Sequence, residues 1–235
     1  MKALIFAAGR GERMRPLSDH TPKPLLRAGG RRLIEWQIAA LAAAGVRDIV
    51  INTAHLPEQF ETALGDGRAL GVRIAWSREG AQAADALETL GGIVAALPLL
   101  GEAPFIVVSG DIVCDFDYRP LAERAAALAS GALDGHLVLV DNPPFNPRGD
   151  MGLAGDRITT TPPHLTYANI ALLAPRLFAG EPAGRRKLFP WLYRAVEAGR
   201  ISGERFGGRW HNVGTPDELA RLDAELSARP LAASA

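Results

Sequence analysis

Short apolar runs alternate with longer segments of helical periodicity along the first 140 residues. The short runs are typical of buried parallel strands, and they cover residues 3–7, 48–52, 72–76, 105–108 and 137–140. The segments between them repeat apolar residues at helical spacing, over residues 33–44, 57–64, 87–97 and 119–129. This alternation predicts an α/β fold with a doubly wound, mostly parallel, Rossmann-like sheet. Sheets of this kind bind ligands beyond the carboxyl ends of their strands.

The pattern changes after residue 141, where prolines divide the chain into short pieces. The apolar positions there predict a hairpin (151–153 and 157–159), a sheet strand (164–173), a helix (187–198), one or two strands within 201–210, and a last helix (216–226). Thr215 and Glu218 have the spacing of a capping box, which supports the start of the last helix. We expect a single domain over residues 1–226 with two halves, 1–140 and 141–226, and a frayed tail over 227–235.

Composition and charge limit the classes of function. Hydrophobic residues make up 48% of the 235 residues, and 26 basic residues balance 26 acidic ones. A balanced charge provides no basic field for nucleic acid. No apolar run approaches the length of a membrane span, and the first strand leaves no room for a signal peptide. Cys114 is the only cysteine, so no disulfide forms within the chain. We therefore expect a cytoplasmic protein that binds neither nucleic acid nor membrane.

A glycine-rich loop with several cations follows the first predicted strand. Glycine and alanine let backbone N–H groups approach a phosphate closely, because no bulky side chain intervenes. A P-loop is excluded, since no Gly-Lys-Ser or Gly-Lys-Thr is present. A dinucleotide fingerprint would need glycine at position 14 and an acidic residue after the second strand. The chain has Met14 and no acidic residue there, which disfavours a Rossmann oxidoreductase. Gly9-x-Gly11 alone also fits a tight turn, but the cations that continue to Lys23 favour a polyphosphate site.

Residues 7–25 resemble the signature of the sugar-1-phosphate nucleotidyltransferases, A-A-G-x-G-x-R-x-x-P followed by P-K-P-L. Further segments resemble the subfamily of uridylyltransferases that act on N-acetylmuramate 1-phosphate: G-E-R-M-R-P-L (11–17), A-L-P-L-L-G (96–101), V-L-V-D-N-P (138–143), R-G-D (148–150) and K-L (187–188). The resemblance implies a GT-A-like nucleotidyltransferase fold whose first half binds the nucleotide, with a small β-rich sugar-binding subregion in the second. It implies the joining of UTP and N-acetylmuramate alpha-1-phosphate, with release of pyrophosphate, in peptidoglycan recycling.

This chemistry brings two anions together, so it needs fixed cations, backbone donors and a carboxylate for Mg²⁺. The resemblance assigns catalysis to Arg13, Lys23 and Asp111, with Asp111 as a metal ligand. The alternatives are solvated surface cations at Arg13 and Lys23, and an Asx turn or a helix cap at Asp111. The expected nucleotide-binding residues are Ala7, Ala8, Gly9, Arg10, Gly11, Glu12, Arg13, Lys23 and Gly91.

The sugar phosphate is expected to contact residues from both halves of the chain. The candidates are Glu88, Gly110, Asp150, Asn169 and Lys187. Lys187 would hold the sugar phosphate, or the lactyl carboxylate if the sugar is a muramic acid; its alternative is a solvated lysine. Gly91 lies in E-T-L-G-G (88–92), which resembles the family's loop for the nucleobase and sugar. Leu90 stands where close relatives have glycine, and the segment from Gln82 to Asp85 resembles a short insertion.

Asn212 departs from the family pattern. In W-H-N-V-G-T-P (210–216) it fills the position where the family usually has an aspartate, the second carboxylate on the metal. An amide oxygen still coordinates magnesium but brings no charge. We expect Asp111 and Asn212 to hold Mg²⁺, and three outcomes are open. The enzyme is active with Asp111 as the one carboxylate, or it needs more magnesium or prefers manganese, and we favour these two together. In the third outcome it has lost catalysis and kept binding.

Two alternatives to this function remain open. One is the same reaction on another pair of substrates, by a guanylyl- or thymidylyltransferase for a hexose or heptose 1-phosphate. The other, of a different class, is a non-catalytic module that binds nucleotide sugars, which the departures at Leu90 and Asn212 would permit. The last predicted helix ends near residue 226, which leaves no room for the C-terminal β-helix that trimerises some longer family members. We therefore expect a monomer or a homodimer.

Overall fold

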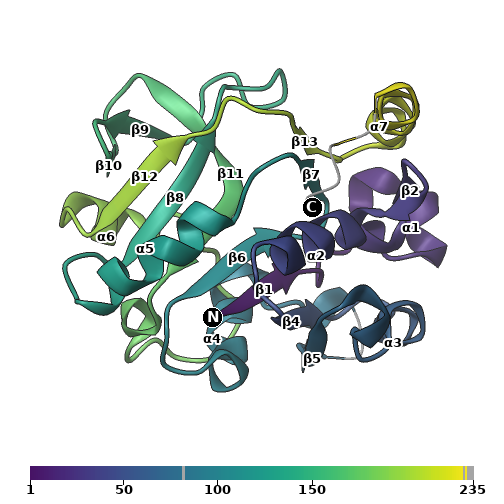
Figure 1. Cartoon of the computed structure of the whole chain (residues 1–235), viewed down its shortest axis with the longest axis horizontal. Helices are drawn as coiled ribbons and strands as arrows, with labels where there is room; N and C mark the ends of the chain where they lie inside the picture. The colour runs from purple at the N-terminus through teal and green to yellow at the C-terminus, as the bar shows by residue number, and fades with distance from the viewer. Residues whose placement is uncertain (81–82, 230, 232–235) are drawn as a thin grey trace.

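A mixed sheet forms the centre of the computed structural model, which describes residues 1–80, 83–229 and 231. The sheet has nine strands in these residues, in the order β5-β4-β1-β6-β11-β8-β12-β10-β9 (Figure 1). In chain order the strands are β1 (Lys2–Phe6), β4 (Asp48–Thr53), β5 (Arg73–Arg78), β6 (Phe105–Ser109), β8 (Gly135–Val140), β9 (Met151–Ala154), β10 (Arg157–Thr159), β11 (His164–Leu173) and β12 (Ile201–Arg205).

The strand directions agree with the predicted sheet. β5, β4, β1 and β6 are parallel neighbours, and β12 is parallel to β8. β11 lies between β6 and β8 and is antiparallel to both. All strands of the sheet except β10 and β11 therefore run in the direction of β1. The α/β class and the mostly parallel sheet are confirmed.

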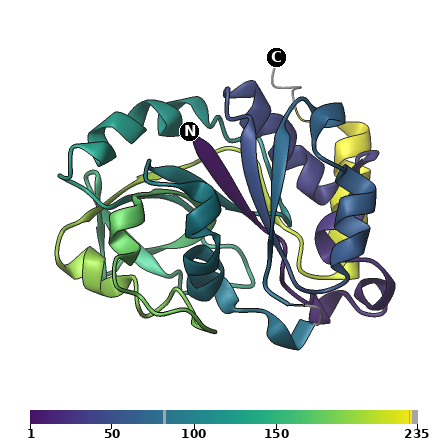
Figure 2. The same cartoon turned by 90° about the horizontal axis from the view of Figure 1, so that it is seen from below.

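Helices cover both faces of the sheet (Figures 1 and 2). One face packs against α2 (Leu33–Ala43), α3 (Pro57–Leu64) and α5 (Arg119–Ala129). The other packs against α4 (Glu88–Leu100) and α6 (Tyr193–Glu197). Successive side chains of a strand point to opposite faces, so Ile5 of β1 joins the first core and Leu4 the second. This arrangement is the doubly wound fold that the sequence predicted.

A smaller unit lies beside the first half of the sheet. It contains the antiparallel pairs β7 (Ile112–Cys114) with β13 (Trp210–Asn212), and β2 (Arg27–Ala28) with β3 (Arg31–Arg32). The last helix, α7 (Pro216–Ala228), has the predicted capping box: Glu218 N–H donates to Thr215 Oγ1 at 3.3 Å, and Thr215 N–H donates to Glu218 Oε2 at 3.0 Å. α7 buries its apolar side against Val113 and Val213, so it anchors the strand that carries Asn212.

The structure corrects two predicted boundaries. The helix predicted over 187–198 forms only over Tyr193–Glu197, because Pro190 has no N–H to donate and disfavours helical backbone at the residue before it. α7 continues to Ala228, and Leu231 is buried in the same cluster as Leu226, so the chain stays packed beyond the predicted start of the tail. Residues 230 and 232–235 of that tail lie outside the described residues.

The remaining elements are short. They are η1 (Glu12–Met14), α1 (Leu17–His20), η2 (Lys23–Leu25), η3 (Arg68–Leu70), η4 (Ala83–Asp85) and η5 (Pro175–Phe178). Of the expected insertion, Ala83 to Asp85 form η4, whereas Gln82 lies outside the described residues. Among the helices of the described chain, none combines the length and the apolar character needed to cross a membrane.

Candidate active site

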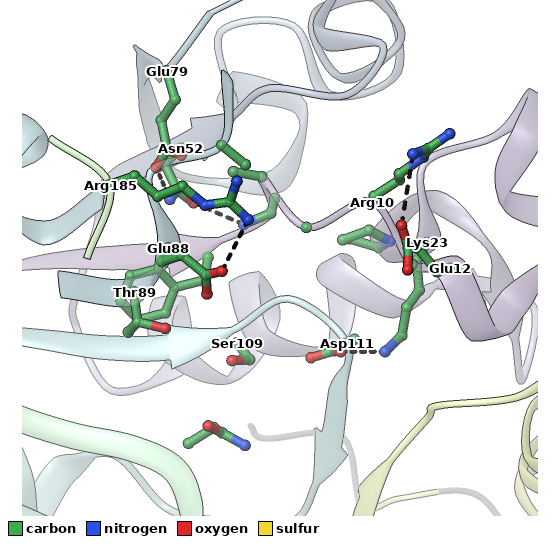
Figure 3. A pocket seen from close by; sticks show the side chains of 18 of the residues that line it. Arg10, Glu12, Lys23, Asn52, Glu79, Glu88, Thr89, Ser109, Asp111 and Arg185 are labelled. Atoms are coloured by element: carbon green, nitrogen blue, oxygen red, sulfur yellow. Dashed lines mark hydrogen bonds and ion pairs between the residues drawn. The ribbon is translucent and has the colours of Figure 1, made fainter. Parts of the chain in front are cut away.

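A cavity of about 610 Å³ opens at the carboxyl ends of β1, β4 and β6 (Figure 3). This is the edge of the sheet where a doubly wound fold binds its ligands. Its lining residues come from the ends of these strands, the start of α4, β11 and the segment before α6. They include Ala7, Ala8, Gly9, Arg10, Gly11, Glu12, Lys23, Asn52, Glu79, Glu88, Thr89, Ser109, Asp111, Tyr167, Asn169 and Arg185.

Residues 7–12, which we call the glycine loop, form one wall of this cavity. Gly11 has a φ of +66°, a conformation that side chains disfavour, and a Cβ there would lie 3.1 Å from Lys23 Cβ. Ser18 Oγ donates a hydrogen bond of 2.8 Å to the Gly11 carbonyl, which fixes the end of the loop. At Gly9 no heavy atom lies within 4 Å of the position of a Cβ. The loop is therefore anchored at its end and open at its centre, as close approach of a phosphate requires.

Lys23 and Asp111 form an ion pair on the cavity wall. Lys23 lies in η2 between Pro22 and Pro24, and its side chain is only 11% exposed; the Asp111 side chain is 24% exposed. Asp111 follows β6 in the turn before β7, where Gly110 N–H donates to the Phe6 carbonyl at 2.9 Å. A lysine this buried needs a charged partner, and the fold supplies one from 88 positions further along the chain.

Asn212 lies on the strand next to Asp111. It pairs with Ile112 across the β13–β7 ladder, and the following Val213 N–H donates to the Asp111 carbonyl at 3.2 Å. Within the described part of the chain, no group of three or more His, Cys, Asp or Glu residues could hold a metal ion. Asp111 lines the cavity, whereas Asn212 is not among its lining residues and is placed beside Asp111 by the backbone alone; the two residues offer one carboxylate and one amide. Such a set fits Mg²⁺, which takes one or two carboxylates and completes its shell with substrate phosphates and water.

Glu79 and Asn52 link three strand ends at the back of the cavity. Asn52 Oδ1 accepts from Ala7 N–H at 2.8 Å, and its Nδ2 donates to Glu79 Oε1 at 2.5 Å. The second oxygen of Glu79 accepts from Leu87 N–H at 2.7 Å, just before α4. Burial raises the pKa of the Glu79 carboxyl. This chain of hydrogen bonds holds the glycine loop, β4 and the start of α4 in a fixed relation.

Two residues with positive φ place their side chains at the cavity. Glu88, the first residue of α4, has a φ of +61°, and its carboxylate lies 3.2 Å from Arg185 Nη2. Asn169 has a φ of +57° and lies in β11 where the register with β8 shifts. Both residues line the cavity. Left-handed backbone is uncommon outside glycine and often marks functional positions, so both residues are candidates for substrate contacts.

Comparison with known proteins decides the family. Residues 2–146, more than half of the chain, match the family described as Nucleotidyl transferase. The chain belongs to the nucleotidyl transferase family. The resemblance expected from the motif at residues 7–25 is thereby confirmed, and so is the enzyme class.

Whole-chain relatives agree with this family. The chain is 46% identical over 229 residues to the N-acetylmuramate alpha-1-phosphate uridylyltransferase of Neisseria meningitidis serogroup B, covering 95% of this chain and 97% of that protein. It is 32% identical over 237 residues to the protein of the same name from Caulobacter vibrioides, covering 96% of each. The fold is similar to that of a crystal structure described as a putative glucose-1-phosphate thymidylyltransferase from Bacillus anthracis. The TM-score is 0.81 and the sequence identity 21%, over 97% of this chain and 95% of that one.

Other residues assigned from the nucleotidyl transferase motifs lie outside the cavity lining. Arg13 is exposed, and its guanidinium Nη2 lies 3.1 Å from where a Cβ of Gly214 would be, beside the start of α7. Lys187 is exposed as well. Asp150 is engaged in the fold: its carboxylate accepts from Tyr167 N–H at 2.8 Å and from Asn146 Nδ2 at 3.1 Å.

The glycines around this nucleotidyl transferase site make room for the chain itself. A Cβ at Gly91 would lie 2.2 Å from the Gly184 carbonyl oxygen, and one at Gly92 would lie 2.5 Å from Glu79 Oε1. At Gly110 a Cβ would lie 3.1 Å from the Phe6 carbonyl oxygen. Close approach of backbone and side chains, as well as of substrate, therefore explains these three positions.

Sequence reasoning missed Asn52, Glu79 and Arg185. The first two carry a usable signal at the ligand-binding edge, since Asn52 is the next-to-last residue of the parallel strand β4 and Glu79 directly follows β5. Arg185 carries none, because an irregular segment from the second half brings it over the cavity.

Proposed function

We propose that the protein transfers the uridylyl group of UTP to N-acetylmuramate alpha-1-phosphate, releasing pyrophosphate, as a cytoplasmic step of peptidoglycan recycling. The observation that carries the proposal is the Lys23–Asp111 pair beside the glycine loop. The pair lines the cavity at the carboxyl ends of the parallel strands, in a chain of the nucleotidyl transferase family. The choice of substrates is supported by relatives that are 46% and 32% identical over nearly the whole chain and bear that activity in their names.

The reaction follows from the charges of its substrates. A phosphate oxygen of the sugar 1-phosphate forms a bond to the α-phosphorus of UTP, and the bond from that phosphorus to the oxygen bridging to the β-phosphate breaks. The electron pair leaves with pyrophosphate. Lys23 offsets the repulsion between the two anions, and backbone N–H groups of the glycine loop donate to the nucleotide phosphates. Mg²⁺, when bound, neutralises phosphate charge as a Lewis acid; Asp111 and Asn212 are the residues that would hold it.

The proposed subsites divide the cavity. Residues Ala7 to Glu12 of the glycine loop face the nucleotide, and Glu88 and Asn169 face the sugar hydroxyls, as their positions in the lining suggest. Gly91 and Gly110 act indirectly, through the close packing that they permit. The positions of Asp150 and Lys187 support no direct contact in this conformation.

Arg13 keeps a proposed role with the triphosphate only by turning its exposed guanidinium from Gly214 toward the cavity. If it does so, Arg13→Ala should raise the KM for UTP by about tenfold or more and leave the KM for the sugar phosphate unchanged, because a charged hydrogen bond is lost only at the nucleotide. Steady-state kinetics with each substrate varied in turn measures this. Equal KM values for UTP in both proteins would leave Arg13 beside α7.

A substrate panel tests the proposed function. UTP, GTP and dTTP are each combined with the 1-phosphates of N-acetylmuramate, N-acetylglucosamine, mannose and a heptose, and pyrophosphate release is followed. The proposal requires the highest kcat/KM with UTP and N-acetylmuramate 1-phosphate. A preference for GTP or dTTP with another sugar would replace it by the guanylyl- or thymidylyltransferase alternative. Binding without turnover across the panel would instead indicate a nucleotide-sugar-binding module. Light scattering of the purified protein tests the expected monomer or homodimer.

A further inference from the structure

Each cation that lines the cavity in the described structure is paired with a carboxylate that also lines it. Two of these pairs lie on the side of the glycine loop: Lys23 with Asp111, and Arg10 with Glu12, whose charged atoms are 3.6 Å apart. The third pair is Arg185 with Glu88, whose charged atoms are 3.2 Å apart. Figure 3 shows the third pair on the opposite side of the cavity from the other two. The cavity therefore has two separate ends that carry a cation, and the Arg185 end lies away from the glycine loop.

The Arg185–Glu88 pair is poorly suited to a structural role. The two side chains are 65% and 34% exposed, and an exposed pair of this kind contributes little to stability. The backbone, in contrast, fixes the segment: Arg186 N–H donates to the Leu87 carbonyl at 2.9 Å, and Leu90 N–H donates to the Arg186 carbonyl at 3.0 Å. Arg185 is thus held over the cavity by its main chain, while its guanidinium stays free to exchange one carboxylate for another.

The rest of the lining offers polar groups that suit a sugar. Thr89, Ser109 and Asn169 contribute hydroxyl and amide groups, and Figure 3 shows Ser109 between Glu88 and Asp111. A sugar whose 1-phosphate lies at Lys23 would extend across these groups, and a substituent on its far side would reach Arg185. A neutral amino-sugar phosphate brings one anionic group, at the phosphate. A sugar acid phosphate brings a second, a carboxylate, and a guanidinium binds carboxylates through two parallel N–H donors.

We propose that Arg185 determines specificity by binding the carboxylate of an acidic sugar 1-phosphate, and that Glu88 occupies this carboxylate position in the free protein. The inference rests on the proposed function and adds the residue that separates a sugar acid from the neutral sugar. It also transfers to Arg185 the lactyl-carboxylate role that the sequence suggested for Lys187, which is exposed outside the cavity lining.

The test compares two acceptors that differ in the lactyl ether, N-acetylmuramate 1-phosphate and N-acetylglucosamine 1-phosphate, with UTP held constant. Arg185→Ala should lower kcat/KM for the acid by about tenfold to a hundredfold, mainly through KM, and change that for the neutral sugar by less than about twofold. Arg185→Lys should recover part of the loss, since it keeps the charge without the planar donors. Glu88→Gln should lower the KM for the acid relative to that for the neutral sugar, because it removes the competing carboxylate and leaves an amide for the sugar hydroxyls.

Arg78→Ala is the matched control. Arg78 forms a comparably exposed pair with Glu61, outside the cavity lining, and its loss should leave both acceptors unaffected. Equal losses on the two acceptors in Arg185→Ala, or no loss on either, would overturn the inference. Calorimetric binding of both sugar phosphates to parent and Arg185→Ala decides it even without turnover. Failure of the proposed function is separate: it would appear as a parent that releases no pyrophosphate from UTP with any acceptor.

Discussion

Replacing Lys23 with methionine should weaken catalysis and tighten metal binding at the same time. Methionine retains much of the aliphatic volume of lysine and removes its charge. In the free protein the ammonium of Lys23 is paired with the carboxylate of Asp111, the acidic residue of the proposed metal position. A cation that binds Asp111 must therefore compete with Lys23, and the substitution ends this competition.

The size of the effect follows from the environment of the pair. With side chains 11% and 24% exposed, the contact is largely shielded from water, so a charge-assisted hydrogen bond here contributes about 1.5–3 kcal/mol. At 1.4 kcal/mol per tenfold, Mn²⁺ should bind the free Lys23→Met protein about tenfold to a hundredfold more tightly than the parent. Turnover should fall by a hundredfold or more, because a charge contact in the transition state contributes about 3 kcal/mol.

Mn²⁺ titration followed by electron paramagnetic resonance, without nucleotide, measures the first effect, and pyrophosphate release measures the second. Circular dichroism and thermal unfolding check that the variant is folded. Lys2→Met serves as the control, because Lys2 starts β1 at the end remote from the cavity. An unchanged Mn²⁺ affinity in a folded Lys23→Met protein would refute the competition. Activity close to that of the parent would remove Lys23 from the mechanism.

Three further predictions concern other parts of the molecule. Asn212→Asp adds a second carboxylate to the proposed metal site, so a magnesium titration should show half-maximal activity at a lower concentration; an unchanged titration would place Asn212 away from the metal. Gly92→Ala puts a Cβ 2.5 Å from Glu79 Oε1, and such overpacking should lower the free energy of unfolding in urea by about 1–3 kcal/mol. The buried His136 ring lies 3.4 Å from Glu204 and lowers the pKa of the Glu204 carboxyl. The ionised carboxylate therefore stabilises the fold at pH values above the pKa that it has in the unfolded chain, and this stabilisation is lost as the pH falls through the lower pKa of the folded state. The difference in unfolding free energy between the parent and Glu204→Gln should shrink below about pH 4, and a constant difference would contradict this.

The local pattern of the chain predicted most elements but not their pairing. Runs of buried residues marked β1, β4, β6 and β8 because parallel strands covered on both faces are apolar throughout. Nothing local placed β11 between β6 and β8, since that order depends on contacts between distant segments. The overlong helix at 187–198 has a physical origin: Leu188, Leu192 and Val196 are buried at helical spacing, but Pro190 prevents the backbone from being helical throughout.

The sequence pointed to the cavity where charged residues follow the ends of predicted strands. Lys23 and Asp111 stand out in the sequence, and the fold joins them. Arg13 and Lys187 show the limit of motif transfer, because a motif gives a residue type and not the direction of a long, exposed side chain. Arg185 could not be found from spacing, since the cavity receives it from a segment whose course is set by backbone hydrogen bonds to the start of α4.

The position of β11 has a consequence for the order in which the enzyme is made. β6 and β8 follow one another in the chain among the strands of the sheet, yet they are joined only through β11, residues 164–173, which pairs with both. During synthesis the β6 edge that will pair with β11 stays open while about sixty further residues leave the ribosome, and an open edge of this kind is prone to pair with other chains. The same strand brings Tyr167 and Asn169 to the cavity. When β11 pairs with β6 and β8, a nascent chain therefore joins the two parts of its sheet and gains one wall of its cavity at the same time; Arg185 and β12 follow later in the chain.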